Sequence, residues 1–335
     1  MLCKRFILLF IGVVLCAPVF GQIDPEEVVA AIVKLEAEVP EAARTAAALG
    51  TERSGSAVVI DSEGLALTIG YLIMEASAVS ISDKDGNMIQ AKIVAYNNAT
   101  GFGLVRAERP LGIGPVEFGD SGGLQTGDPA LVISHGGPQS MLLATVAARR
   151  DFAGYWEYLL EDAIFTSPAH PRFGGAALIG PEGRLVGIGS LIVPDAAEEG
   201  VQSQPGNMFV PINALKPILG ELIAEGNTRG PRSPWIGVFT EMDRGHLFVT
   251  RVAEDGPAQK AGVEAGDIIL KVGNEPVESL ADFFRKMWAL GEAGVDVPLS
   301  ILRKSQVKQI TVRSADRYKW LRFQAELGFT AMLGP

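Results

Sequence analysis

The stretch from Gly55 to Thr68, GSAVVIDSEGLALT, decides how most of this chain folds. Residues 56–60 and 65–68 are apolar runs with the length of a strand, and residues 61–64 between them are Asp-Ser-Glu-Gly, which favour a turn. The stretch therefore predicts two strands joined by a tight turn.

The same pattern of short apolar runs and turns continues on both sides of this stretch. Further strands are predicted at residues 33–39, 79–82, 88–95, 104–107, 130–134, 142–147, 176–179, 185–190 and 208–211. Many short strands with regular turns predict an all-β barrel or sandwich. Residues 24–30 begin with the helix-start pattern Asp-Pro-Glu-Glu, and residues 212–225 predict an amphipathic helix.

A second unit follows a linker at residues 227–234, which contains Gly230, Pro231 and Pro234. A predicted strand that opens with 235–238 and further strands at 266–272, 297–302 and 309–312 are interspersed with a short helix within 256–262 and a longer one at 280–290. This mixture is typical of a small α+β domain.

The first 21 residues have the features of a signal peptide: an early basic pair, the apolar run 6–16, and small residues before a cut at Gln22. They predict secretion across the inner membrane to the periplasm. The alternative is a lipoprotein acylated at Cys16, which the large Leu15 before it disfavours.

Composition excludes several kinds of site. Both cysteines, Cys3 and Cys16, lie in the predicted leader, so the mature chain has no disulfide or thiol nucleophile. The histidines His135, His170 and His246 are far apart, and we expect neither a metal site nor a cofactor. Removing the leader leaves 27 basic residues against 39 acidic ones, which argues against nucleic-acid binding.

Residues 119–123, Gly-Asp-Ser-Gly-Gly, match the surroundings of the nucleophile in chymotrypsin-like serine proteases. Ser121 would then be catalytic, but it would need a base within hydrogen-bond reach and oxyanion donors. Glycine, aspartate and serine are also ordinary turn residues, and the string alone leaves both interpretations open.

Residues 55–68, 119–128 and 207–226 together resemble the protease domain of the HtrA/Deg family, and residues 235–313 resemble a PDZ domain. The PDZ likeness lies in Trp235-Ile236-Gly237-Val238 and in Pro257, Ala258, Ala261, Gly262, Gly266 and Asp267. The resemblance implies a mainly β chain: a chymotrypsin-like double β-barrel over 22–226, the linker, a PDZ domain over 235–315, and a C-terminal tail from 316 to 335.

The resemblance also implies that the catalytic triad is degenerate. The positions of the histidine, aspartate and serine hold Tyr71, Gly101 and Phe173, and a position that donates to the oxyanion holds Pro171. Tyrosine is a poor base at neutral pH, phenylalanine has no nucleophilic atom, and proline has no N–H. In this family the 119–123 string is a non-catalytic turn, so the three positions should meet between the barrels and Ser121 should lie elsewhere.

The favoured function is therefore a non-catalytic HtrA-like pseudoprotease of the cell envelope that binds peptide C-termini or unfolded proteins. The N–H groups of Trp235, Ile236, Gly237 and Val238 would hold a terminal carboxylate. Four apolar residues of the 280–290 helix could either line the peptide groove or belong to the core: Phe283, Phe284, Met287 and Trp288. Of these, we expect Phe284 and Met287 to line the groove.

Two alternatives stay open. In the first, the protein is an active endopeptidase with Ser121 as a displaced nucleophile. His170 is the nearest histidine to Phe173, but a loop role for it is favoured over that of a relocated base. In the second, the chain is an inactive regulatory subunit that joins an active relative, or it forms a homo-trimer as members of the resembled family do.

Overall fold

The computed structural model describes residues 24–197 and 204–321. The predicted leader 1–21, including Cys3 and Cys16, lies outside these residues. The first described element is α1 (Pro25–Ala30), whose N-terminus is capped by Asp24 through a 2.9 Å hydrogen bond from the Glu26 N–H. Within the described ranges, no helix has the length and apolar character needed to cross a bilayer.

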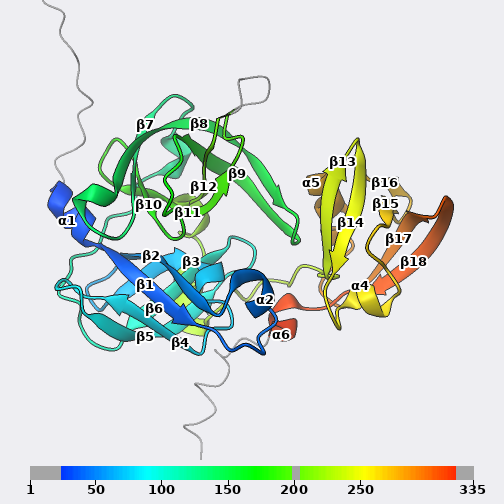
Figure 1. Cartoon of the computed structure of the whole chain (residues 1–335), viewed down its shortest axis with the longest axis horizontal. Helices are drawn as coiled ribbons and strands as arrows, with labels where there is room; N and C mark the ends of the chain where they lie inside the picture. The colour runs from blue at the N-terminus through cyan, green and yellow to red at the C-terminus, as the bar shows by residue number, and fades with distance from the viewer. Residues whose placement is uncertain (1–23, 198–203, 322–335) are drawn as a thin grey trace, which may run out of the picture.

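The first barrel is closed in the order β1-β2-β3-β6-β5-β4 (Figure 1). Its strands are β1 (Ile32–Glu38), β2 (Glu52–Val59), β3 (Leu65–Ile69), β4 (Ala78–Ser82), β5 (Met88–Tyr96) and β6 (Phe102–Ala107), with α2 (Ala46–Leu49) and the 3-10 turn η1 (Gly70–Leu72) between them. The turn between β2 and β3 forms because the Asp61 side chain accepts hydrogen bonds from the N–H groups of Glu63 and Leu65.

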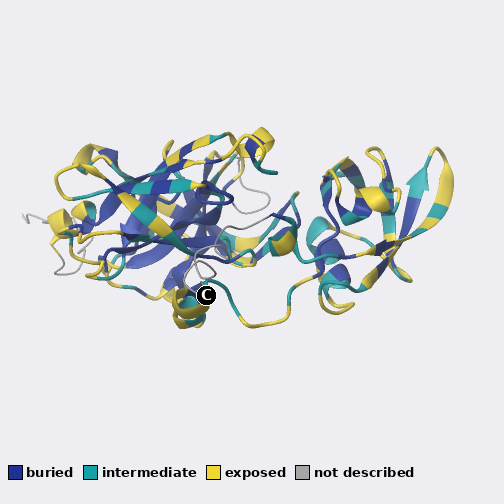
Figure 2. Cartoon of the chain, turned by 90° about the horizontal axis from the view of Figure 1, so that it is seen from below, coloured by how far each residue is buried: buried dark blue, intermediate teal, exposed yellow. Residues whose placement is uncertain are grey.

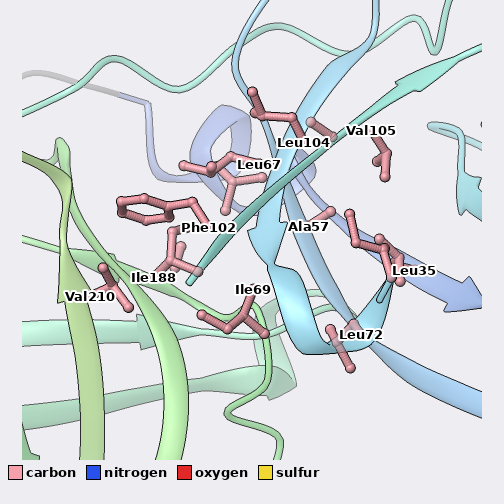
Figure 3. Close-up of a cluster of buried hydrophobic side chains, with 14 of the residues drawn as sticks. Leu35, Ala57, Leu67, Ile69, Leu72, Phe102, Leu104, Val105, Ile188 and Val210 are labelled. Carbon is pink, nitrogen blue, oxygen red and sulfur yellow. The ribbon is translucent and has the colours of Figure 1, made fainter. Parts of the chain in front are cut away.

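The second barrel is closed in the order β10-β11-β12-β9-β8-β7. Its strands are β7 (Pro129–Ile133), β8 (Met141–Gly154), β9 (Tyr158–Ser167), β10 (Ala177–Ile179), β11 (Leu185–Val193) and β12 (Gly206–Pro211), with the 3-10 turns η2 (Ser121–Gly123), η3 (Pro138–Ser140) and η4 (Ile212–Ala214) and the helix α3 (Leu219–Glu225). One apolar cluster extends across both barrels, and in it Ile69 and Phe102 lie beside Ile188 and Val210 (Figure 3).

The C-terminal sheet has the order β13-β14-β15-β17-β18, with β13 at one edge. Its elements are β13 (Val238–Asp243), β14 (His246–Val252), β15 (Ile268–Val272), β16 (Glu275–Pro276), β17 (Asp296–Arg303) and β18 (Gln306–Arg313), with α4 (Pro257–Lys260) and α5 (Leu280–Trp288). The barrels and this sheet lie at opposite ends of the molecule, and the partly exposed segment 227–233 leads from one to the other (Figure 2).

The predicted fold class, a chymotrypsin-like double β-barrel followed by a small α+β domain, is confirmed. Two expectations about its elements were wrong. Residues 212–225 form η4 and α3 instead of one helix, with Pro217, which lacks an N–H donor, between them. The chain also contains strands β9 and β14, which were not predicted, and β8 runs to Gly154 instead of ending near 147.

Residues 317–320 of the predicted tail form a short helix, α6 (Arg317–Trp320), that packs on the first barrel. The Tyr318 hydroxyl accepts a 2.6 Å hydrogen bond from the Asn98 N–H and donates to the Tyr96 carbonyl at 3.3 Å. The Trp320 ring lies 4.5 Å from the Trp235 ring, at the start of the C-terminal domain. This helix therefore ties the two parts of the chain together.

Candidate functional site

Tyr71 lies beside the loop that carries Phe173, where the two barrels meet, and Gly101 contacts the residue before Tyr71. Tyr71 lies on η1, and a Cβ on Gly174 would be 2.8 Å from its hydroxyl. Gly101 accepts a 2.7 Å hydrogen bond from the Gly70 N–H, directly before Tyr71. Gly101 has no side chain, so it cannot orient a catalytic base or stabilise the charge on it.

The phenol of Tyr71 acts as a structural donor in this junction. Its hydroxyl donates a 3.0 Å hydrogen bond to the carbonyl oxygen of Ser190 on β11. Burial raises the pKa of Tyr71 above its ordinary value, so the phenol stays protonated at neutral pH. A protonated phenol cannot take a proton from a nucleophile.

The backbone around Phe173 is held firmly by both barrels. The Gly174 carbonyl accepts a 2.9 Å hydrogen bond from the Ser56 N–H of β2, and the Gly175 N–H donates to Gly189 of β11. Gly175 has φ +72°, and a Cβ there would lie 1.9 Å from the Ser56 carbonyl oxygen, so only glycine fits. The loop keeps a defined shape without a nucleophilic atom at Phe173.

His170 and Pro171 lie in the same loop. His170 is buried, its Nδ1 accepts from the Arg172 N–H at 3.1 Å, and its Nε2 is 3.2 Å from the Ser140 carbonyl. Both ring nitrogens are therefore engaged with backbone groups, and burial lowers the pKa of this histidine. Pro171 contributes no N–H to an oxyanion site.

Ser121 is buried on η2, where polar contacts hold the turn to the end of the second barrel. Its hydroxyl accepts a 3.1 Å hydrogen bond from the Asn213 N–H at η4. The neighbouring Asp120 binds the Asn213 side-chain amide at 2.6 Å, and Lys216 donates to the Gly119 carbonyl at 2.6 Å. These contacts make the 119–123 string a structural turn.

A serine–histidine pair that sequence reasoning missed joins the two barrels. The Ser56 hydroxyl on β2 lies 2.9 Å from Nδ1 of His135 and accepts a 3.0 Å hydrogen bond from the His135 N–H. It also lies 3.0 Å from the Ser134 hydroxyl, and the Ser56 side chain is 0% exposed. A substrate carbonyl cannot reach this serine, so the pair is part of the barrel interface.

Three of the four N–H groups expected to hold a carboxylate do so in this structure, whereas the Trp235 N–H donates to the Ala315 carbonyl at 3.1 Å. The Glu157 side chain accepts hydrogen bonds from the N–H groups of Ile236, Gly237 and Val238 at 3.0, 2.6 and 2.9 Å. Glu157 lies at the tip of the β8–β9 hairpin, is buried, and has φ +58°, a backbone conformation uncommon outside glycine. Burial raises its pKa to about 7, and the three N–H donors oppose that rise.

The apolar side chains expected to line a peptide groove lie inside the folded domain. Phe284 and Met287 of α5 are both 0% exposed and belong to the core of the C-terminal domain, as does Phe283. Ala153 and Leu159 of the β8–β9 hairpin pack against the same cluster. As the chain is folded, a ligand cannot touch Phe284 or Met287.

Comparison with known proteins fits both parts of the fold. Residues 55–188 match the model of the trypsin-like peptidase domain, and residues 234–313 match that of the PDZ domain. This chain belongs to the HtrA family. Two solved structures of the HtrA-type protease AlgW, with a decapeptide and with a tripeptide, have TM-scores of 0.51 and 0.50 at 20% and 21% identity. The matched regions cover 86% and 87% of this chain, and 96% and 97% of the two AlgW chains. At this low identity, the likeness supports the fold alone.

Curated relatives of this HtrA chain are named as periplasmic serine proteases. The chain is 27% identical over 288 residues to the probable periplasmic serine protease do/HhoA-like of Haemophilus influenzae, covering 82% of this chain and 60% of the relative. It is 25% identical over 272 residues to the periplasmic serine endoprotease DegP of Escherichia coli K12, covering 77% and 56%. The chain thus spans little more than half the length of these relatives.

Proposed function

We propose that this HtrA-family chain is a non-catalytic pseudoprotease of the periplasm that binds peptide C-termini or unfolded protein segments through its PDZ domain. The observation that carries the proposal is the set of three N–H groups at Ile236, Gly237 and Val238, which converge on one carboxylate. Such a loop beside an edge strand is the arrangement by which a sheet captures a peptide end.

The barrel junction supports the non-catalytic part of the proposal. Tyr71 donates to a backbone carbonyl, Gly101 has no side chain, and Phe173 has no nucleophilic atom. Acyl transfer needs an activated nucleophile and oxyanion donors, and removing one donor alone slows an intact enzyme by about 100- to 1000-fold. The relatives' names as serine proteases therefore describe a chemistry that these residues do not support.

The rival function is an endopeptidase that uses Ser121. Its hydroxyl is buried and already accepts a hydrogen bond from Asn213, and no histidine among the described residues forms a hydrogen bond with it. A serine without a base within hydrogen-bond reach stays a weak nucleophile.

Both parts of the proposal can be tested with the full-length protein. A fluorophosphonate probe and a casein-cleavage assay, with Escherichia coli DegP as the active control, should detect neither labelling nor cleavage. Peptides with a free C-terminal carboxylate should bind more tightly than the same peptides with a C-terminal amide. Labelling that disappears in Ser121→Ala would establish the rival enzyme, and equal binding of acid and amide would contradict carboxylate capture.

A further inference from the structure

The tip of the β8–β9 hairpin contacts the PDZ domain with the two main interactions of a bound peptide. The Glu157 carboxylate sits on the three N–H groups of residues 236–238. Two residues earlier, the Tyr155 carbonyl accepts a 3.1 Å hydrogen bond from the Thr240 N–H of the edge strand β13. A terminal carboxylate on an N–H loop and main-chain pairing with an edge strand define peptide capture by strand addition.

Side chains of the hairpin also contact β13 and α5, the two elements expected to line the peptide groove. The Tyr155 ring lies 6.2 Å from the Phe239 ring on β13. On the opposite side, Asp151 forms an ion pair with Arg285 on α5. The hairpin is drawn in Figure 1 as the two strands that leave their barrel and point toward the C-terminal sheet. The hairpin therefore contacts both of these elements.

The helix α6 keeps the hairpin and the PDZ domain in this arrangement. Arg317 donates a 3.1 Å hydrogen bond from Nη1 to the Trp156 carbonyl at the hairpin tip. The next residue, Tyr318, binds the first barrel through Asn98. Because the hairpin belongs to the same chain, its contact with the groove is intramolecular and does not depend on protein concentration.

We infer that the hairpin tip is an internal ligand of the PDZ domain, and that a peptide with a free C-terminal carboxylate binds only after Glu157 leaves the N–H loop. This inference rests on the proposed peptide-binding function. One set of N–H groups cannot hold two carboxylates, which would also repel each other. The apparent Kd of a peptide is then its intrinsic Kd divided by the fraction of molecules with an open groove.

The test uses the full chain and a fluorescein-labelled peptide that copies residues 150–156 and ends in an added valine with a free carboxylate. Its binding is measured by fluorescence anisotropy for the wild type, Glu157→Gln, Glu157→Ala and the matched control Glu161→Gln, which removes an exposed carboxylate from the same hairpin. The amide form of the peptide reports on the need for the carboxylate. Hydrogen exchange at the amides of residues 236–238 reports hairpin docking without any peptide.

Both Glu157 variants should bind the acid peptide about tenfold or more tightly than the wild type, and their 236–238 amides should exchange faster. Glu161→Gln should match the wild type in both measurements. Equal binding curves and unchanged exchange in the Glu157 variants would overturn the internal-ligand inference. Faster exchange without peptide binding by any of the proteins would support the hairpin contact and refute the proposed capture of peptide ends.

Discussion

The substitution Tyr71→Phe separates a structural from a catalytic role for the residue at the barrel junction. It removes only the hydroxyl that donates to the Ser190 carbonyl at 3.0 Å, and Ser190 is buried. A buried acceptor that loses its donor costs about 1–3 kcal/mol. For a domain of about 150–250 residues, each kcal/mol lowers the Tm by about 2–4 °C, so we expect a decrease of roughly 2–12 °C.

Differential scanning calorimetry of the full chain measures this decrease in the transition of the two barrels. The matched control is Tyr155→Phe, because the Tyr155 side chain is 57% exposed and the change keeps its ring. Exposed substitutions usually change stability by less than about 0.5 kcal/mol, so this variant should melt close to the wild type. An unchanged Tm for Tyr71→Phe would refute the structural role, and loss of a wild-type peptidase activity in this variant would show that the phenol is catalytic.

Three further predictions concern other parts of the molecule. Ser121→Ala leaves the Asn213 N–H without its acceptor and should destabilise the second barrel by about 1–3 kcal/mol in chemical denaturation, with no effect on fluorophosphonate labelling. The pKa of Glu157 rises from an ordinary 4.5 to about 7 in the docked hairpin, so docking should weaken as pH rises between these values. Hydrogen exchange at 236–238, corrected for the intrinsic rate, should therefore be faster at pH 8 than at pH 5, and Glu157→Gln should abolish this dependence. Asp267→Ala breaks a buried pair with Arg303 and should cost about 3 kcal/mol, whereas Arg313→Ala, which breaks the exposed pair with Asp296, should cost less than about 1 kcal/mol in the same denaturation assay.

Much of the barrel architecture could be predicted because its signals are local. The alternation of Val33, Leu35 and Ala37 with charged residues marks β1, and these three side chains are buried as expected. The turn at Asp61 follows from a side chain that binds N–H groups two and four residues later. Such patterns need no knowledge of the rest of the chain.

The β8–β9 hairpin could not be predicted because its alternation is broken. Register shifts near Ala148 and Phe152 change which face successive residues of β8 present. Arg150, in the middle of this strand, places its guanidinium 4.0 Å from the Phe165 ring. The partner of Glu157 is also invisible to local reasoning, since 79 residues separate it from Ile236.

The location of the hairpin determines what can be learned from the C-terminal domain in isolation. Residues 234–315, separated from the barrels, would lose Ala153 and Leu159 from their apolar cluster and Glu157 from their N–H loop. The isolated fragment would present a vacant groove and newly exposed apolar surface. Peptide affinities measured on the fragment would be those of a PDZ domain without the competing hairpin. The affinity relevant to the cell is the one measured on the intact chain.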